Sequence, residues 1–346
     1  MNLKNLLVIT LLFFASFIYS VNEEAILAKD FPRKISDYSF FTDGTNQVPH
    51  ENLLPYELIS PLFSDYSYKK RFVYVPNGKA GTYKEDWVYD FPVGSALVKT
   101  FYFPVDERNL HLGNKLLETR VLLRQEDGWK AVSYAWNEEQ TEAFIKIAGK
   151  TIYADWLDLT GQKRNVRYRV PNVNQCKECH SANDKITPIG PKPTNLNKLL
   201  DYKEGTFNQL SFLLSKGYID QIDQNLRKTV DWRDESQTLD ARARSYLAIN
   251  CGHCHSKTGV ANSTGLYLDL RENKDVHLGI FKSPVATGRG SGGLKYSIVP
   301  GRAEESILLY RMRSTDPGIM MPESGRALIH KEAVKLIEDW INDMES

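Results

Sequence analysis

Residues 173–180 read VNQCKECH, and residues 247–255 read LAINCGHCH. Each stretch holds two cysteines that are separated by two residues and followed directly by a histidine. The two motifs use all four cysteines of the chain and contain three of its seven histidines. A pattern that repeats in this way predicts two copies of one chemical site. The defining positions of the pattern are Cys176, Cys179, His180, Cys251, Cys254 and His255.

The CxxCH spacing is typical of c-type haem attachment. Two thiols have to reach the two vinyl groups on one edge of a porphyrin, and two intervening residues keep them at a suitable distance. The next histidine then donates an imidazole nitrogen to the iron. The sequence therefore predicts two covalently bound haem c groups, with His180 and His255 as proximal ligands. Disulfide bonds and a zinc site are the alternatives, but the histidine after each pair disfavours the first, and the long separation of Cys179 from Cys251 disfavours the second.

The first twenty residues, MNLKNLLVITLLFFASFIYS, combine a lysine near the start with an apolar run and a small or polar end. This is the pattern of a secretory signal peptide, with cleavage expected near Ser20. The apolar run is shorter than the roughly 20 residues of an ordinary membrane span. We therefore expect residues 1–20 to be removed and the remaining chain to be exported, to the periplasm or an equivalent compartment, without a membrane span.

Residues 30–170 are rich in Tyr, Phe, Val and Thr, with turn residues at short intervals. This composition predicts an antiparallel β domain, whose role the sequence does not reveal. The clearest hairpin lies in its second half. Residues 117–123 and 129–135 show strand-like alternation, and Glu126-Asp127-Gly128 is the expected turn between them.

The pattern changes after residue 170, where strands give way to loops and helical segments. We assign residues 171–237 as the first haem-binding segment and residues 238–346 as a second haem domain. Asp240 is the expected N-cap of a helix that runs into the second motif. A last helix is predicted from an apolar face at helical spacing. That face consists of Ala333, Leu336, Ile337, Trp340 and Ile341.

Residues 238–346 resemble class I cytochrome c in the order of a helix, the CxxCH motif, the sequence GIMMPE at residues 318–323 and a closing helix. The resemblance implies that Met321 is the distal ligand of the second haem, with Met320 the weaker candidate. Filling of a core gap is the alternative role for both methionines. The predicted fold class is thus α+β multidomain: an N-terminal antiparallel β domain, followed by a mainly α, cytochrome c-like haem region.

The whole chain after the leader resembles a family of uncharacterised bacterial dihaem c-type cytochromes. The matching stretches include SPLFSDYSYKKRFVYVP at residues 60–76, PNVNQCKECH at residues 171–180 and SIVPGRAEESILLYRMRS at residues 297–314. The resemblance implies exported electron transfer with a redox partner protein, for which a periplasmic dehydrogenase is the candidate.

The two motifs differ in the residues that come after them. Residues 181–250 contain neither a methionine nor a histidine, so the segment after the first motif offers no conventional distal ligand. Three alternatives stay open: a ligand from elsewhere in the chain, an atypical ligand such as tyrosine or lysine, or an open coordination position. The candidates from elsewhere are His50, His111, His277, Met312 and His330.

Two functions fit these features. The first is one-electron transfer, in which haem iron cycles between Fe(II) and Fe(III) and no side chain is catalytic. The second is a dihaem, peroxidase-like oxidoreductase with an open position on the first haem. Electron transfer is favoured because few residues separate the two motifs, whereas peroxidase-like dihaem proteins have a larger haem domain between theirs. The sequence leaves open whether the chain is an enzyme. The 44 basic and 43 acidic residues nearly balance, which gives no support for nucleic-acid binding.

Overall fold

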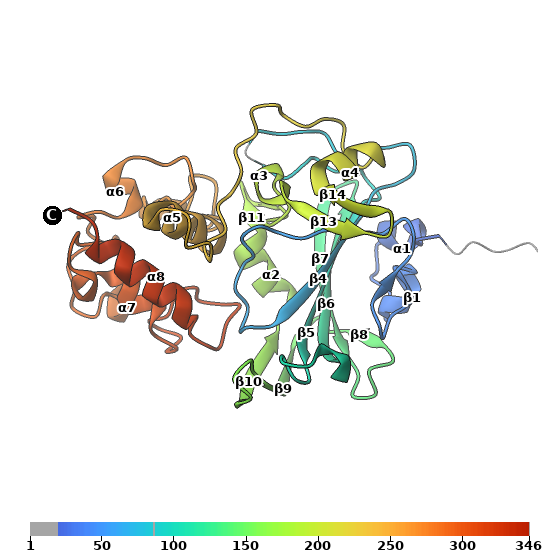
Figure 1. Ribbon diagram of the computed structural model, residues 1–346, viewed down its shortest axis with the longest axis horizontal. Coiled ribbons are helices and arrows are strands. Elements are labelled where there is room, and N and C mark those ends of the chain that lie inside the picture. The colour runs from blue at the N-terminus through green and yellow to red at the C-terminus, as the bar shows by residue number, and fades with distance from the viewer. Residues whose placement is uncertain (1–19, 86, 346) are drawn as a thin grey trace, which may run out of the picture.

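The computed structural model describes residues 20–85 and 87–345. Residues 1–19 of the predicted signal peptide lie outside the described residues. Figure 1 shows a β-rich body with the helices α5 to α8 beside it, and the C-terminus lies on the side far from α1.

Fourteen strands are found in the part of the chain that the structure describes, and all their pairings are antiparallel. Their bounds are β1 Phe41–Asp43, β2 Val48–Pro49, β3 Leu54–Pro55, β4 Tyr68–Tyr74, β5 Ala96–Pro104, β6 Asn114–Gln125, β7 Gly128–Trp136, β8 Ala143–Ile145, β9 Lys150–Leu157, β10 Lys163–Val170, β11 Ser181–Ala182, β12 Lys185–Ile186, β13 Leu199–Tyr202 and β14 Gly205–Asn208. Strands β3 to β8 form one six-stranded sheet in sequential order, and the others form two-stranded hairpins.

The helices are short. The α-helices are α1 Glu23–Leu27, α2 Val173–His180, α3 Pro193–Leu196, α4 Gln209–Ser215, α5 Leu239–Asn250, α6 Asp275–Leu278, α7 Ile307–Met312 and α8 Lys331–Asn342. The 3-10 helices are η1 Ile35–Tyr38, η2 Leu110–Leu112, η3 Asn262–Thr264, η4 Gly288–Ser291 and η5 Ala303–Glu305.

The hairpin predicted around Glu126-Asp127-Gly128 is confirmed. Strands β6 and β7 pair from Glu118 with Ala135 to Gln125 with Gly128, so Glu126 and Asp127 form a two-residue turn. Gly128 has a φ of 121°, a conformation that side chains other than glycine rarely adopt. A tight turn of this kind fixes the register of the two strands.

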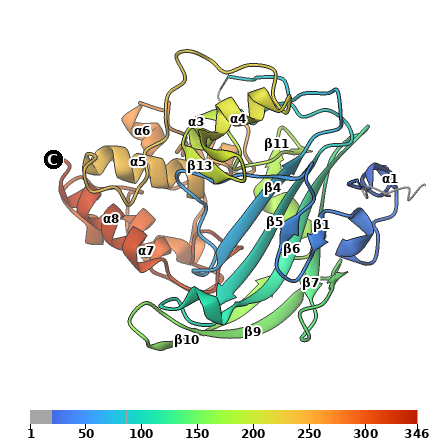
Figure 2. The ribbon, with the colours of Figure 1, turned by 45° about the vertical axis from the view of Figure 1, so that its right-hand side comes forward.

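The central sheet is covered on both faces. One face packs against α1 and η1 through buried side chains such as Tyr38, Val98 and Tyr134. Burial of an apolar side chain of this size stabilises the fold by about 1.5–3 kcal/mol. The other face carries two separate apolar clusters. One packs against α3 and α4 and includes Leu97. The other packs against the hairpin β9–β10, which lies beside the sheet in Figure 2, and there Phe103 stacks on Trp156.

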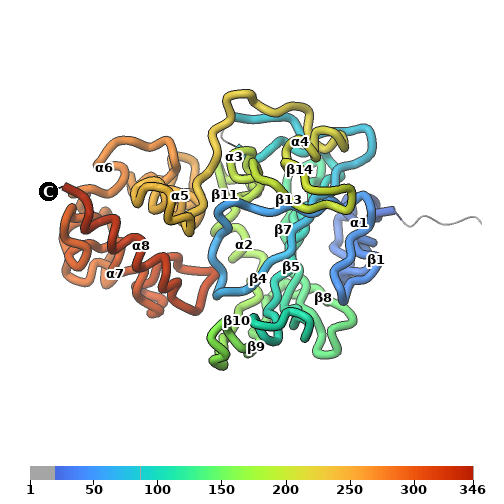
Figure 3. Tube along the Cα trace, in the orientation of Figure 1, coloured from blue at the N-terminus to red at the C-terminus, as the bar shows by residue number. Residues whose placement is uncertain are grey.

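The predicted fold class is wrong for residues 171–346. Only four α-helices of seven or more residues, namely α2, α4, α5 and α8, occur among the described residues. Long irregular stretches and the hairpins β11–β12 and β13–β14 fill the rest of this region, so it is not mainly α (Figure 3). The strong helical patterns lie at the two ends of residues 238–346. The loops between them have no hydrophobic periodicity that would predict their structure.

The helices predicted at the start and the end of residues 238–346 are present as α5 and α8, but the N-cap of α5 differs from the predicted residue. Helix α8 buries the apolar face that its sequence predicts. Helix α5 is capped by Thr238, whose Oγ1 accepts a hydrogen bond from the Ala241 N–H at 3.2 Å. The predicted cap, Asp240, lies instead in the first turn, where its carboxylate accepts a hydrogen bond from Trp340 Nε1 on α8 at 2.9 Å. The acidic side chain therefore joins α5 to α8.

Candidate functional site

Both CxxCH motifs line one cavity of about 950 Å³. A volume of this size lies at the upper end of the range that small-molecule and cofactor sites occupy. The cavity lies between the second face of the central sheet and the segments that contain α5, α7 and the loop before α8. All seven site residues predicted from the sequence line it. They are Cys176, Cys179, His180, Cys251, Cys254, His255 and Met321.

The first motif is held on helix α2. Asn172 caps this helix: its side chain accepts a hydrogen bond from the Gln175 N–H, and the Gln175 side chain accepts one from the Asn172 N–H. This reciprocal cap starts the helix directly after β10, and the two thiols then lie one turn apart. The His180 imidazole is oriented by Thr187, because its Nδ1 lies 2.9 Å from the Thr187 carbonyl oxygen.

The orientation of His180 suits an iron ligand. Burial lowers the pKa of His180 to about 4, so the ring is neutral at pH 7. A neutral ring that donates its Nδ1–H to a carbonyl keeps the Nε2 lone pair free, which is the common arrangement of metal-bound histidines.

The second motif begins where α5 ends. The main-chain N–H of Cys251 donates to the Leu247 carbonyl at 2.8 Å, and the N–H of His255 donates to the Cys251 carbonyl at 2.8 Å. The motif is therefore a continuation of the helical turn. Burial lowers the pKa of His255 to about 4 and raises that of Cys251 to about 12. The His255 Nδ1 atom is buried, and no side chain among the described residues pairs with it.

The two motifs touch each other. The Cys254 thiol lies 3.6 Å from the Glu178 carbonyl oxygen. Hydrogen bonding between the Cys179 and Cys254 thiols lowers the pKa of Cys179 and raises that of Cys254. All four cysteines are free thiols. Among the residues with described positions, no three His, Cys, Asp or Glu side chains are arranged to hold a metal ion by themselves.

Met321 and Met320 have different surroundings. Met321 lines the cavity, whereas Met320 is buried at 8% exposure and does not. The loop that carries them is held by Arg326, whose Nη2 donates to the carbonyl oxygens of Met321 at 2.9 Å and Ser314 at 2.8 Å, and whose Nη1 donates to that of Leu328 at 3.2 Å. No sequence pattern indicates this arginine, because its partners are main-chain atoms.

The other candidate ligands separate into two groups. Met312 and His330 line the cavity, whereas His50, His111 and His277 do not. His277 is paired with Glu272, with 2.9 Å between Nδ1 and Oε2, and His111 is exposed. Of the five residues considered for the first haem, only Met312 and His330 therefore share the cavity with the motifs.

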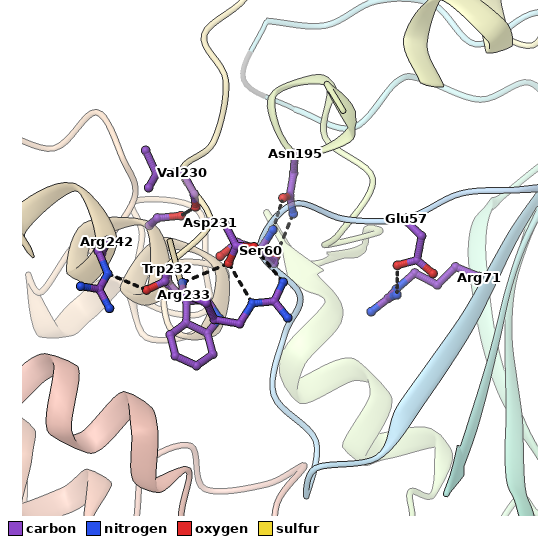
Figure 4. A network of polar contacts seen from close by, with 10 residues as sticks. Glu57, Ser60, Arg71, Asn195, Val230, Asp231, Trp232, Arg233 and Arg242 are labelled. Atoms are coloured by element: carbon purple, nitrogen blue, oxygen red, sulfur yellow. Dashed lines mark hydrogen bonds and ion pairs between the residues drawn. The ribbon is translucent and has the colours of Figure 1, made fainter. Parts of the chain in front are cut away.

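Residues 60–66 join the sheet to the C-terminal segments. The Asn195 side chain holds the main chain of Ser60 through two hydrogen bonds of 2.9 and 3.1 Å (Figure 4). The Phe63 N–H donates to Asn250 Oδ1 at 2.8 Å, one residue before the second motif. Asp65 Oδ1 accepts hydrogen bonds of 2.7 Å from the N–H groups of Ala327 and Leu328.

His330 lies in an aromatic cluster at this junction. Its ring stacks on Phe63 with 4.1 Å between centroids and meets Trp232 edge to face at 5.0 Å. Its Nδ1 lies 3.1 Å from the Tyr246 hydroxyl. Burial lowers the pKa of His330 to about 4.

This lowered pKa predicts acid sensitivity. The unfolded chain binds a proton at His330 near pH 6.5, and the folded chain does not. The contribution of the neutral ring to the free energy of unfolding is therefore fully present above pH 6.5 and is lost as the pH falls toward 4. We expect His330→Gln, which does not titrate, to reduce the loss of unfolding free energy between pH 7 and about pH 4.5 by roughly 2 kcal/mol. Urea unfolding at both pH values measures this. An equal loss in both proteins would contradict the prediction, and His111→Gln, at an exposed site, is the matched control.

The residues around the cavity fit covalently bound haem. Four free thiols in two CxxC pairs line one cavity, and Cys179 of the first pair contacts Cys254 of the second. The His253 side chain hydrogen-bonds to the Cys179 thiol, and the buried His255 Nδ1 atom has no side-chain partner among the described residues. The donor set therefore suits two haem groups, with His180 and His255 placed as ligands.

Comparison of the chain with known protein families, with curated proteins and with solved structures finds no match. The resemblances to class I cytochrome c and to the dihaem cytochromes therefore stay predictions. In the part of the chain that the structure describes, none of the helices has the length and apolar character needed to cross a bilayer.

Proposed function

We propose that the chain is an exported dihaem c-type cytochrome that transfers single electrons. The observation that carries the proposal is that both CxxCH motifs line one cavity and contact each other through Cys179 and Cys254. Cys176 and Cys179 would hold one haem and Cys251 and Cys254 the other. When bound, haem supplies an iron centre that gains and loses one electron.

The chain's own residues would position and shield the two groups. His180 would offer Nε2 to one iron, with Nδ1 held by the Thr187 carbonyl oxygen, and His255 would be the corresponding ligand at the second motif. Met321 faces the same space and is the proposed distal ligand at the second motif. The direct contact of the two motifs favours transfer from one haem to the other. The electron would then pass to or from a partner protein, for which a periplasmic dehydrogenase is our candidate.

A spectroscopic experiment tests the proposal. We expect a pyridine haemochrome assay on the purified protein to give two haems per chain. Absorption spectra of the reduced protein with and without carbon monoxide then separate the carrier from a peroxidase-like enzyme. Two low-spin haems that do not bind carbon monoxide support the electron-carrier function. Carbon monoxide binding at the first haem would instead support the peroxidase-like enzyme. A purified protein without haem would contradict both functions.

The distal ligand gives a sharper prediction. We expect Met321→Ala to convert one of two low-spin signals to high-spin and to let that haem bind carbon monoxide, because the variant removes the only donor atom of this side chain. Met320→Ala is the matched control, since its side chain does not line the cavity, and its spectrum should be unchanged. An unaltered spectrum for Met321→Ala would show that another residue is the ligand.

A further inference from the structure

Three cationic side chains lie side by side on the sheet face that forms one wall of the cavity. Arg71 on β4 pairs directly with Lys99 on β5, and Lys99 pairs directly with Arg120 on β6. All three line the cavity. Neighbouring strands are about 4.8 Å apart, so the row is roughly 10 Å long. Like charges directly opposite one another destabilise a sheet, which makes such a row unusual unless an anion faces it.

Carboxylates of the described residues pair with two of the three cations and leave Lys99 without a partner. Glu57 pairs with Arg71 at 3.4 Å, and Glu118 pairs with Arg120. No carboxylate in the described ranges forms an ion pair with Lys99. Burial, followed by the charges of Arg71 and Arg120, lowers the pKa of Lys99 well below its usual value. Lys99 is thus the member of the row without an opposite charge, and a carboxylate bound beside it would favour its protonated form.

The cations are fixed in place by an aromatic ring. Lys99 Nζ lies 4.6 Å and Arg120 Cζ 4.3 Å from the centroid of Phe101. Contact of a cation with a ring face is favourable, and it holds both heads at the sheet surface. Arg71 is buried, and its contact with Glu57 is visible in Figure 4.

Arg120 is the member of the row nearest to the first motif, and Arg71 is the member farthest from it. Helix α2 packs on β7, the neighbour of the strand that carries Arg120. The charge of Arg120 acts on the Cys176 thiol, and that of Lys99 acts on His180. Arg71 lies two strands farther from α2 than Arg120 does.

We propose that Arg71, Lys99 and Arg120 form a carboxylate-binding site on this wall of the cavity. The inference rests on the proposed function for its preferred ligand, the two propionates of the haem held at Cys176 and Cys179. These groups lie on the porphyrin edge opposite the vinyl groups, so they suit a cationic row that leads away from the thiols. Arginine and lysine bind carboxylates through charge-assisted hydrogen bonds.

Lys99→Met tests the site with a small change of shape. We expect the variant to keep both haems and to show a lower midpoint potential for one of them, because loss of a nearby positive charge favours the oxidised iron. Lys99→Arg keeps the charge and should keep the potential. Lys70→Met is the matched control. It is next to Arg71 on β4 but on the opposite face, and it does not line the cavity.

The outcomes are distinct. Two haems with unchanged potentials in Lys99→Met would overturn the site while leaving the proposed function intact. A shift of the wild-type potential by added succinate, absent in Lys99→Met, would identify a free carboxylate as the ligand in place of the propionates. If the wild-type protein holds no haem, the proposed function fails, and succinate titration by calorimetry then decides the site alone. Binding that weakens at least tenfold in Lys99→Met supports it, and no binding to the wild type overturns it.

Discussion

Replacing Cys176 and Cys179 together with serine is expected to halve the haem content of the purified protein, from two haems per chain to one. Serine oxygen does not form the thioether bond, and the two thiols of a motif hold one porphyrin between them. The chain has no other cysteine outside the second motif that could substitute. The pyridine haemochrome assay gives the stoichiometry, and intact-protein mass spectrometry shows the loss of one covalent haem.

The same double substitution at Cys251 and Cys254 is the matched experiment. It should also leave one haem, and the change at all four positions should leave none. Because Cys179 and Cys254 contact each other, each double variant also tests whether one site forms without the other. Full haem content in either double variant would contradict covalent attachment at that motif.

Arg326→Met is expected to lower the free energy of unfolding by roughly 4 kcal/mol. The guanidinium donates to the carbonyl oxygens of Ser314, Met321 and Leu328 at 2.8–3.2 Å. Hydrogen bonds from a charged donor contribute about 1.5–3 kcal/mol each, and a buried carbonyl that loses its donor keeps its desolvation cost. Methionine fills a similar volume but offers no donor, so the loss is electrostatic and not a packing defect.

Denaturant unfolding followed by tryptophan fluorescence measures this change. Arg302→Met is the control, because Arg302 is exposed and its partner Glu305 lies at 3.5 Å, a surface ion pair that contributes little. Arg326→Lys should recover only part of the loss, since a single ammonium cannot reproduce the planar fork. Stability within about 0.5 kcal/mol of wild type in Arg326→Met would show that the loop is held by other contacts.

The parts of the fold that follow from local pattern were predictable. The alternation around Gly128 and the apolar face of α8 both depend on neighbouring residues only, and both are confirmed. The fold class was not predictable in the same way, because the loops between α5 and α8 have no periodic pattern. The resemblance to class I cytochrome c implied a mainly α region there, and the structure contradicts that assignment.

For the candidate site, too, features that depend on local sequence were predictable, and features that depend on contacts between distant segments were not. The CxxCH spacing identifies each motif, and the resemblance to class I cytochrome c implies Met321. That the motifs share a cavity depends on contacts between distant segments, such as Asp65 with Ala327 and Leu328, and no local pattern reports them. The row of Arg71, Lys99 and Arg120 is visible only once the strand register is known. The predicted domain limits and the haem content stay predictions.

The contact of Asp65 with Ala327 and Leu328 also bears on the order of maturation. The partners are 262 and 263 residues apart in the sequence, so this contact forms only after all of the intervening chain has been synthesised. If the chain carries haem as we propose, the thiols of both motifs are most accessible before this contact forms. We therefore expect haem attachment to precede the docking of Asp65 on Ala327 and Leu328.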